Sequence, residues 1–211
     1  MLEMVQTQCK ADLEKVCQRM QITGDSLAAE HSRGILPSLM AQTKDLCQLT
    51  CLYSIVPYKT SIPLEDLKDC SYLVCCFVSV GPHLNEAIEA LFQKGDYLEG
   101  FLLDHLGNEI LFNASNEMNA LIAQRLHALG MKHTCRFSPG EGELGLEYQA
   151  YILDTLKKAG EVPADLNDHF MLSPEKSILY MIGAGEKITS GSLKHDCSLC
   201  DQVTCYFRIN N

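Results

Sequence analysis

The chain has 211 residues, of which 46% are hydrophobic and 21% charged, so it can build a core and lacks the composition of a disordered protein. Its formal net charge of −10 argues against nucleic-acid binding, which needs clustered lysine and arginine. The longest apolar run, around SYLVCCFVSV, is far shorter than the ~20 residues of a membrane-spanning helix.

The N-terminus has no basic segment followed by an apolar stretch, so we expect no signal peptide. The chain contains 11 cysteines, an odd number that fits free thiols or metal ligands better than a disulfide framework. Thiols stay reduced in the cytosol. The sequence therefore predicts a cytoplasmic protein with no membrane segment and no nucleic-acid partner.

The first half of the chain contains predicted helices followed by predicted strands. Apolar residues at helical spacing predict two helices, DLEKVCQRM at 12–20 and GILPSLMAQTKDLCQLT at 34–50. CLYSIVPY at 51–58 predicts a strand. The β-branched and cysteine-rich run DCSYLVCCFVSVG at 69–81 predicts a buried strand.

A helical block opens the second half, from about Pro82 to Leu129, and Gly95 divides it into two or three helices. KHTCRF at 132–137 predicts a strand, and a helix that ends near Lys158 follows a glycine-rich turn. SILYMIGAG, which begins at Ser177, predicts the last strand. Because the strands do not alternate regularly with helices, the pattern favours a mixed α+β fold over a doubly wound one.

The segment RFSPGEGELGLEYQ at 136–149 contains three glycines that match G-x-G-x-x-G, the pattern of a dinucleotide-binding turn. Such a site also needs an acidic residue about 20 positions further on, at the end of a second strand, and here the acidic residues lie in a predicted loop. Glu141 and Glu143 would also set two carboxylates against a pyrophosphate. The sequence therefore argues against a dinucleotide site.

The charges of the same segment suit a zwitterion or a cation. Arg136 can bind a carboxylate through two parallel hydrogen bonds, and a rigid Ser-Pro-Gly turn follows it at 138–140. Glu141 or Glu143 can face an ammonium or sulfonium group, and S-adenosylmethionine carries all three charges. On spacing alone, the favoured alternative is a surface ion pair between Arg136 and one of these glutamates in an ordinary turn.

Four segments, in the same order, resemble the activation domain of cobalamin-dependent methionine synthase and the free-standing bacterial proteins built like it. CRFSPGEGELGLEYQ is similar to the R-x-S-P-G-Y turn of that family, and DHFMLSPEKSILYMIGAG to its P-x-K-S strand. LKDCSYLVCCFVSVGPHLNEAI resembles a strand with a T-x-G turn before a helix. GDYLEGFLLDHLGNEILFNASNEMNALIAQRLHAL resembles the paired helices. The likeness runs from about His31 to Arg208.

The resemblance implies an α+β fold with a mixed, mainly antiparallel twisted sheet and helices packed around it. It also implies an N-terminal helical extension at 1–30, an activation-like domain at 31–194, and a cysteine-containing tail at 195–211 packed on that domain. In such proteins the domain binds S-adenosylmethionine and docks on a corrinoid protein, and cobalamin is reactivated by reductive methylation.

The implied partners are therefore a corrinoid protein or cobalamin-dependent methyltransferase, which holds the corrinoid, and an electron donor protein. This chain has no corrinoid-binding D-x-H-x-x-G motif, and we assign it no catalytic residue. It would act at most as a component of a methionine synthase-like system.

The resemblance also assigns individual residues, with Arg136 implied to hold the methionine carboxylate. The residues implied to lie at the cleft are Arg136, Ser138, Pro139, Gly140 and Glu141 from the first segment and Lys176 and Ser177 from the matching strand. Glu141 stands where the family has an aromatic residue, and Leu144 where free-standing members often have tryptophan.

The tail HDCSLCDQVTC places Cys197, Cys200 and Cys205 as C-x2-C-x4-C, with His195 two residues upstream. Three thiolates and one further donor complete a tetrahedral zinc site, and the same cysteines could hold an iron–sulfur cluster. The alternatives are surface thiols without a ligand, or a reversible disulfide. A metal here would support a second function, a metal or iron–sulfur binding protein with a degenerate S-adenosylmethionine cleft.

Overall fold

A computed structural model describes residues 1–22, 24–59 and 62–193, and its main feature is a five-stranded sheet in the order β1-β2-β3-β7-β4. All neighbouring strands of this sheet pair antiparallel. The strands are β1 (Leu2–Met4), β2 (Thr50–Pro57), β3 (Tyr72–Ser79), β7 (Ser177–Gly185) and β4 (Lys132–Phe137). The predicted α+β class with a mainly antiparallel sheet is confirmed.

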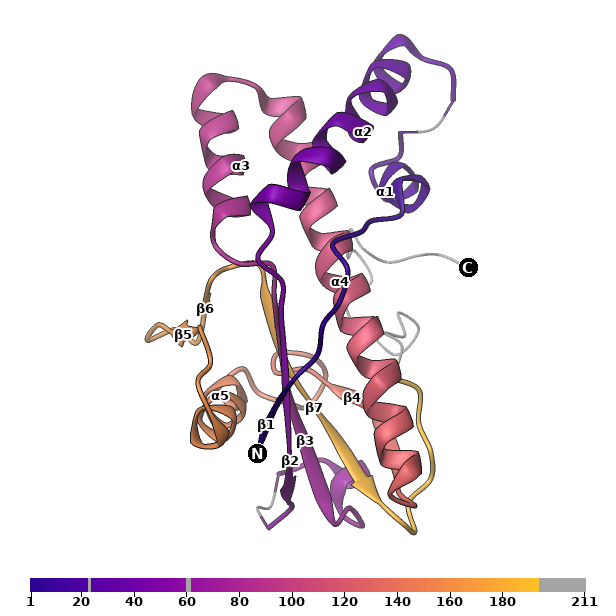
Figure 1. Ribbon diagram of the computed structural model, residues 1–211, viewed down its shortest axis with the longest axis vertical. Coiled ribbons are helices and arrows are strands. Elements are labelled where there is room, and N and C mark those ends of the chain that lie inside the picture. The colour runs from indigo at the N-terminus through magenta and orange to yellow at the C-terminus, as the bar shows by residue number, and fades with distance from the viewer. Residues whose placement is uncertain (23, 60–61, 194–211) are drawn as a thin grey trace.

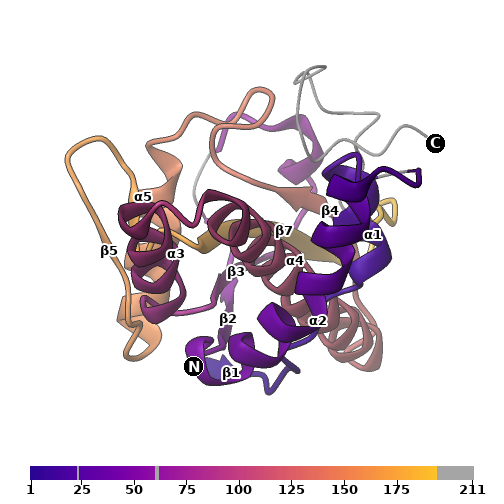
Figure 2. The same cartoon turned by 90° about the horizontal axis from the view of Figure 1, so that it is seen from above.

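The helices cover both faces of the sheet and extend beyond one end of it (Figure 1). They are α1 (Leu13–Arg19), α2 (Leu27–Leu46), the short 3-10 helix η1 (Glu65–Leu67), α3 (His83–Lys94), α4 (Tyr97–Ala128) and α5 (Tyr148–Ala159). Two short strands, β5 (Asp165–Leu166) and β6 (Leu172–Ser173), pair in a separate ribbon. Seen from above, α3 and α2 lie to either side of α4 (Figure 2).

The alternating side chains of β3 and β7 build a core on each side of the sheet. Val74, Cys76 and Val78 face the α4 side, whereas Leu73, Cys75 and Phe77 face the α5 side. This is the period of two that a strand buried on both faces requires. The sheet is therefore the middle of three layers.

The long helix α4 is buried on more than one side and packs in two separate hydrophobic clusters. Leu103 and Ile110 pack in the core beneath the sheet, while Leu102 and Leu106 pack with α1 and α2 in a third cluster. Gly95 has φ +87 at the end of α3, which permits the sharp turn into α4 and confirms the predicted division of the helical block.

The structure differs from the sequence predictions at the start of one helix and in three short strands. The helix predicted at 34–50 begins earlier, at Leu27, where Ser26 accepts a hydrogen bond from the Ala29 N–H, and it ends at Leu46. The strands β1, β5 and β6 were not predicted, because runs of two or three residues carry no readable periodicity. None of the helices in the described ranges is long and apolar enough to cross a bilayer.

Residues 1–30 contact the rest of the fold through β1 and α1, and they also contain the first residues of α2. β1 pairs with β2 at the edge of the sheet, and Val16 of α1 packs against α2 and α4. The division into an extension, a central domain and a tail stays a prediction.

Candidate functional site

Arg136 lies near the end of β4, on the face of the sheet that α4 covers. The ladder between β4 and β7 is irregular between His133 and Arg136, after which Arg136 pairs with Ile182. Ile182 belongs to the core beneath α4. Directly paired residues point to the same face, so the bulge turns Arg136 toward the helix layer.

The guanidinium of Arg136 lies over an aromatic ring, and one of its nitrogens, Nε, has no hydrogen-bond partner among the described residues. Its central carbon lies 5.0 Å from the centroid of the Tyr180 ring, a cation–π arrangement. Nη2 donates to Ser138 Oγ at 3.3 Å, and Nε is buried with no hydrogen-bond partner among the described residues. A buried donor without a partner costs on the order of 1–3 kcal/mol, a cost that any acceptor reaching this nitrogen would remove.

Tyr180 is fixed by a buried polar network on α4. Its hydroxyl donates to Asn119 Oδ1 at 2.7 Å and lies 3.3 Å from Ser115 Oγ, which donates to it. Asn119 in turn donates to the carbonyl of Leu193 at 3.0 Å. Burial raises the pKa of Tyr180 well above its usual value, so the hydroxyl keeps its proton. The ring beneath Arg136 is therefore rigid and neutral.

The bend after β4 is a closed turn rather than a phosphate cradle. The Glu141 N–H donates to the Ser138 carbonyl at 3.1 Å and Gly140 has φ +86, the features of a type II turn with proline in second place. The Gly140 N–H donates to the carbonyl of Leu144, whose side chain is 2% exposed and packs in the core beneath α5. Because β4 and β7 are antiparallel, no βαβ dinucleotide unit exists here, as the sequence indicated.

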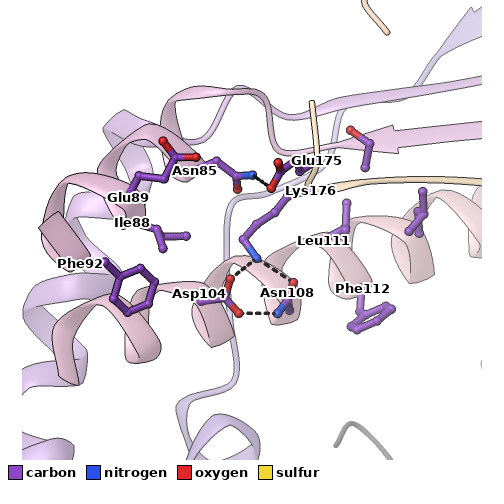
Figure 3. A pocket seen from close by; sticks show the side chains of 12 residues that line it. Asn85, Ile88, Glu89, Phe92, Asp104, Asn108, Leu111, Phe112, Glu175 and Lys176 are labelled. Carbon is purple, nitrogen blue, oxygen red and sulfur yellow. Dashed lines mark hydrogen bonds and ion pairs between the residues drawn. The ribbon is translucent and has the colours of Figure 1, made fainter. Parts of the chain in front are cut away.

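A pocket of about 490 Å³ lies between α3, α4 and the start of β7 (Figure 3). Its lining combines apolar side chains with three carboxylates and one ammonium group. The charged members are Glu89, Asp104, Glu175 and Lys176. Among the lining side chains, Asn85 Nδ2 donates to Glu175 at 3.0 Å (Figure 3).

Lys176 and Ser177 line this pocket, but protein groups already bind both side chains. The Lys176 ammonium donates to Asp104 Oδ1 at 2.7 Å and to Asn108 Oδ1 at 3.0 Å. Ser177 Oγ donates to Ser79 Oγ at 2.8 Å, which joins β7 to β3. Their predicted contact with a ligand stays a prediction, and what the structure shows is that they shape the pocket wall.

The residues predicted for one cleft thus fall into two groups, one at the pocket and the other at the end of β4 and in the turn that follows it. Ile178 lines the pocket, and Tyr180, which carries the Arg136 guanidinium, is the next residue of β7 on the same face of the sheet. Alternate residues of a strand are about 7 Å apart. The Tyr180 ring that carries the guanidinium is therefore one side-chain step beyond Ile178 along β7, and Arg136 itself is not part of the pocket lining.

The predicted metal ligands Cys197, Cys200, Cys205 and His195 lie outside the described residues. Within the described part of the chain, no group of three or more histidine, cysteine, aspartate or glutamate side chains could hold a metal ion. Zinc or iron–sulfur binding therefore stays a prediction about the tail.

Comparison with known proteins supports the fold through a structural likeness alone. No protein-family model and no curated protein sequence matches the chain. The chain is similar to the crystal structure of the MetH reactivation domain bound to AdoHcy, with a TM-score of 0.62 and 10% sequence identity over 90% of this chain and 80% of that one. The chain thus has a methionine synthase reactivation-domain-like fold.

Sequence reasoning missed the residues that hold the predicted ones in place. A tyrosine in a buried strand needs a polar partner, which is a readable signal for Tyr180. Asp104 and Asn108, four residues apart, had to share a helix face. Nothing in the sequence pairs that face with Lys176, because the contact joins residues 72 positions apart.

Proposed function

We propose that this chain binds S-adenosylmethionine and serves as an accessory reactivation domain for a partner that holds a corrinoid. The observation that carries the proposal is the Arg136 guanidinium, which is fixed over Tyr180 and has an unpartnered Nε. The likeness of the fold to a domain bound to AdoHcy supports it.

The available groups match the ligand's amino-acid end. A carboxylate takes two parallel hydrogen bonds from a guanidinium, and Arg136 has one nitrogen free and a second in a long bond to Ser138. Glu141 and Glu143 are exposed on the adjacent turn, where they favour a positive ammonium or sulfonium. The remainder of the ligand would lie toward Ile178 and the pocket.

S-adenosylmethionine supplies a methyl group in such reactions, and the part of this chain would be to bind and orient it. The rigid turn and the Tyr180 ring would fix the ligand's amino-acid end at little entropic cost. A corrinoid protein or cobalamin-dependent methyltransferase and an electron donor protein complete the proposal as partners.

Isothermal titration of the full chain with S-adenosylmethionine and with AdoHcy tests this proposal. We expect saturable binding that Arg136→Met weakens roughly 10- to 100-fold, because charge-assisted hydrogen bonds contribute about 1.5–3 kcal/mol each. Lys132→Met is the matched control, since Lys132 is an exposed cation of the same strand and should leave the affinity within about twofold. No binding of either ligand at millimolar concentration, by a protein that stays folded, refutes the proposal.

A further inference from the structure

Two cysteines that are far apart in the sequence meet where the N-terminal segment crosses the end of α2. Cys9 and Cys47 are 38 positions apart, and Cys47 is the largest influence on the pKa of Cys9, so the two side chains are neighbours. Cys9 Sγ also lies 3.5 Å from the carbonyl oxygen of Thr43, which accepts the N–H of Cys47 at 2.9 Å. One carbonyl of α2 thus positions both residues.

The chain around this pair is anchored on both sides. Lys10, next to Cys9, forms an ion pair with Glu117 of α4 at 2.6 Å, and Asn113 donates to the Lys10 carbonyl at 3.2 Å. Cys47 ends α2 as its C-cap. The two sulfurs therefore stay close without a large search through conformations.

The surroundings make one of the two thiols reactive. The hydrogen bond from Cys47 lowers the pKa of Cys9 to about 7, helped by Thr43 and by the positive charge of Lys44 and opposed by partial burial. The hydrogen bond and burial raise the pKa of Cys47, which therefore stays protonated. A thiolate beside a protonated thiol is the arrangement of a nucleophile and its resolving partner.

The other described cysteines do not share these properties. Cys51, Cys70, Cys75 and Cys76 are buried. Cys17 and Cys135 are partly exposed, but burial raises the pKa of each. Both members of the Cys9–Cys47 pair are partly exposed, so a small oxidant can reach them.

We propose that Cys9 and Cys47 form a peroxide-reactive dithiol that closes to a disulfide and fastens the N-terminal segment to the end of α2. The Cys9 thiolate attacks hydrogen peroxide, the O–O bond breaks, and Cys9 becomes a sulfenic acid while hydroxide leaves. The Cys47 thiol then attacks that sulfur, so that the S–S bond forms, the S–O bond breaks and the oxygen leaves as water. The dithiol loses two electrons and two protons, and the peroxide is reduced to two waters. The proposal does not depend on S-adenosylmethionine binding.

Peptide mapping of the full chain after treatment with hydrogen peroxide tests the linkage. Trypsin releases Cys9 in peptide 1–10 and Cys47 in peptide 45–59, which also contains Cys51, so fragmentation must assign the bonded sulfur. We expect a Cys9–Cys47 link in wild type and in Cys17→Ala, and a dimedone-reactive sulfenic acid at Cys9 in Cys47→Ser, which keeps a hydrogen-bond donor beside Cys9 but cannot form the disulfide. A Cys9 that stays reduced while Cys17 is oxidised, or that links mainly to another cysteine, overturns the proposal.

A second measurement needs no variant. In the reduced wild type, Cys9 should react with iodoacetamide at pH 7 on the order of tenfold faster than Cys17, with a pH midpoint near 7. A midpoint at or above the ordinary thiol value of 9.0, or a rate equal to that of Cys17, overturns the assignment of Cys9 as the nucleophile.

Discussion

Replacing Lys176 by methionine tests whether the ion pair at the pocket stabilises the fold. Methionine keeps most of the aliphatic side chain that packs beside α4 and removes the charge. The Lys176 side chain is 9% exposed and that of Asp104 is 39% exposed, so the pair is half-shielded from water. Asn108 bonds to both, because its Nδ2 donates to Asp104 Oδ2 at 3.1 Å.

The expected loss follows from these contacts. The variant removes two hydrogen bonds from a charged donor, each of which contributes about 1.5–3 kcal/mol when shielded. Asp104 keeps its bond from Asn108 and reaches water, which offsets roughly half of that loss. We therefore expect the free energy of unfolding to fall by about 2 kcal/mol, or Tm by roughly 4–8 °C for a chain of this size.

Urea unfolding of the wild type, Lys176→Met, Asp104→Asn and the double variant measures the loss and the coupling between the two residues. We expect a coupling energy of about 1–2 kcal/mol. Lys187→Met is the control. Lys187 is exposed two residues beyond the other end of β7, so its replacement should change the free energy of unfolding by less than about 0.5 kcal/mol. If Lys176→Met is as mild as the control, the ammonium is solvated and the reasoning fails.

Three further changes have defined outcomes. A Cβ added to Gly183 would lie 2.5 Å from a buried sulfur, so Gly183→Ala should lower the free energy of unfolding in urea by about 1–3 kcal/mol. Gly34→Ala, in open space on a helix, should raise it by about 0.5–1 kcal/mol. Tyr180→Phe leaves a buried amide oxygen without its donor and should cost about 1–3 kcal/mol by calorimetry while the ring keeps its place under Arg136; a neutral result contradicts the network. Burial lowers the pKa of His105 from 6.5, so as pH falls below 6.5 the unfolded chain binds a proton that the folded chain does not. The free energy of unfolding should therefore fall as the pH falls below 6.5. His105→Gln should make that fall smaller in acid unfolding curves.

The sequence predicted the long elements because their patterns are strong and local. The strand at Tyr72–Ser79 is apolar on both faces, and the helices at His83–Lys94 and Tyr148–Ala159 have clear amphipathic periods. The beginning of α2 was missed because its first residues, Leu27 to Gly34, are largely polar or small and carry little periodic signal. β1 forms only because β2 offers it a partner about 50 residues away.

The candidate site was predictable only in part, because several of its contacts join residues that are far apart in the sequence. Arg136 could be singled out because a guanidinium beside a rigid Ser-Pro-Gly turn and acidic residues suits a zwitterion, and its side chain does lie on the helix-covered face of the sheet. Its ring partner Tyr180, and the contact of Cys9 with Cys47, join residues whose separation in sequence carries no periodic signal. Such contacts are properties of the packed layers rather than of any single segment.

The length of α4 has a consequence for what can bind. Asp104, which holds the pocket lysine, and Ser115, which contacts the tyrosine under Arg136, stand eleven residues apart on one uninterrupted helix, or about 16 Å at 1.5 Å per residue. That spacing cannot contract without breaking backbone hydrogen bonds. Under the proposed function, a free amino acid would span only one end of this distance, so the length of α4 would favour a ligand large enough to reach both.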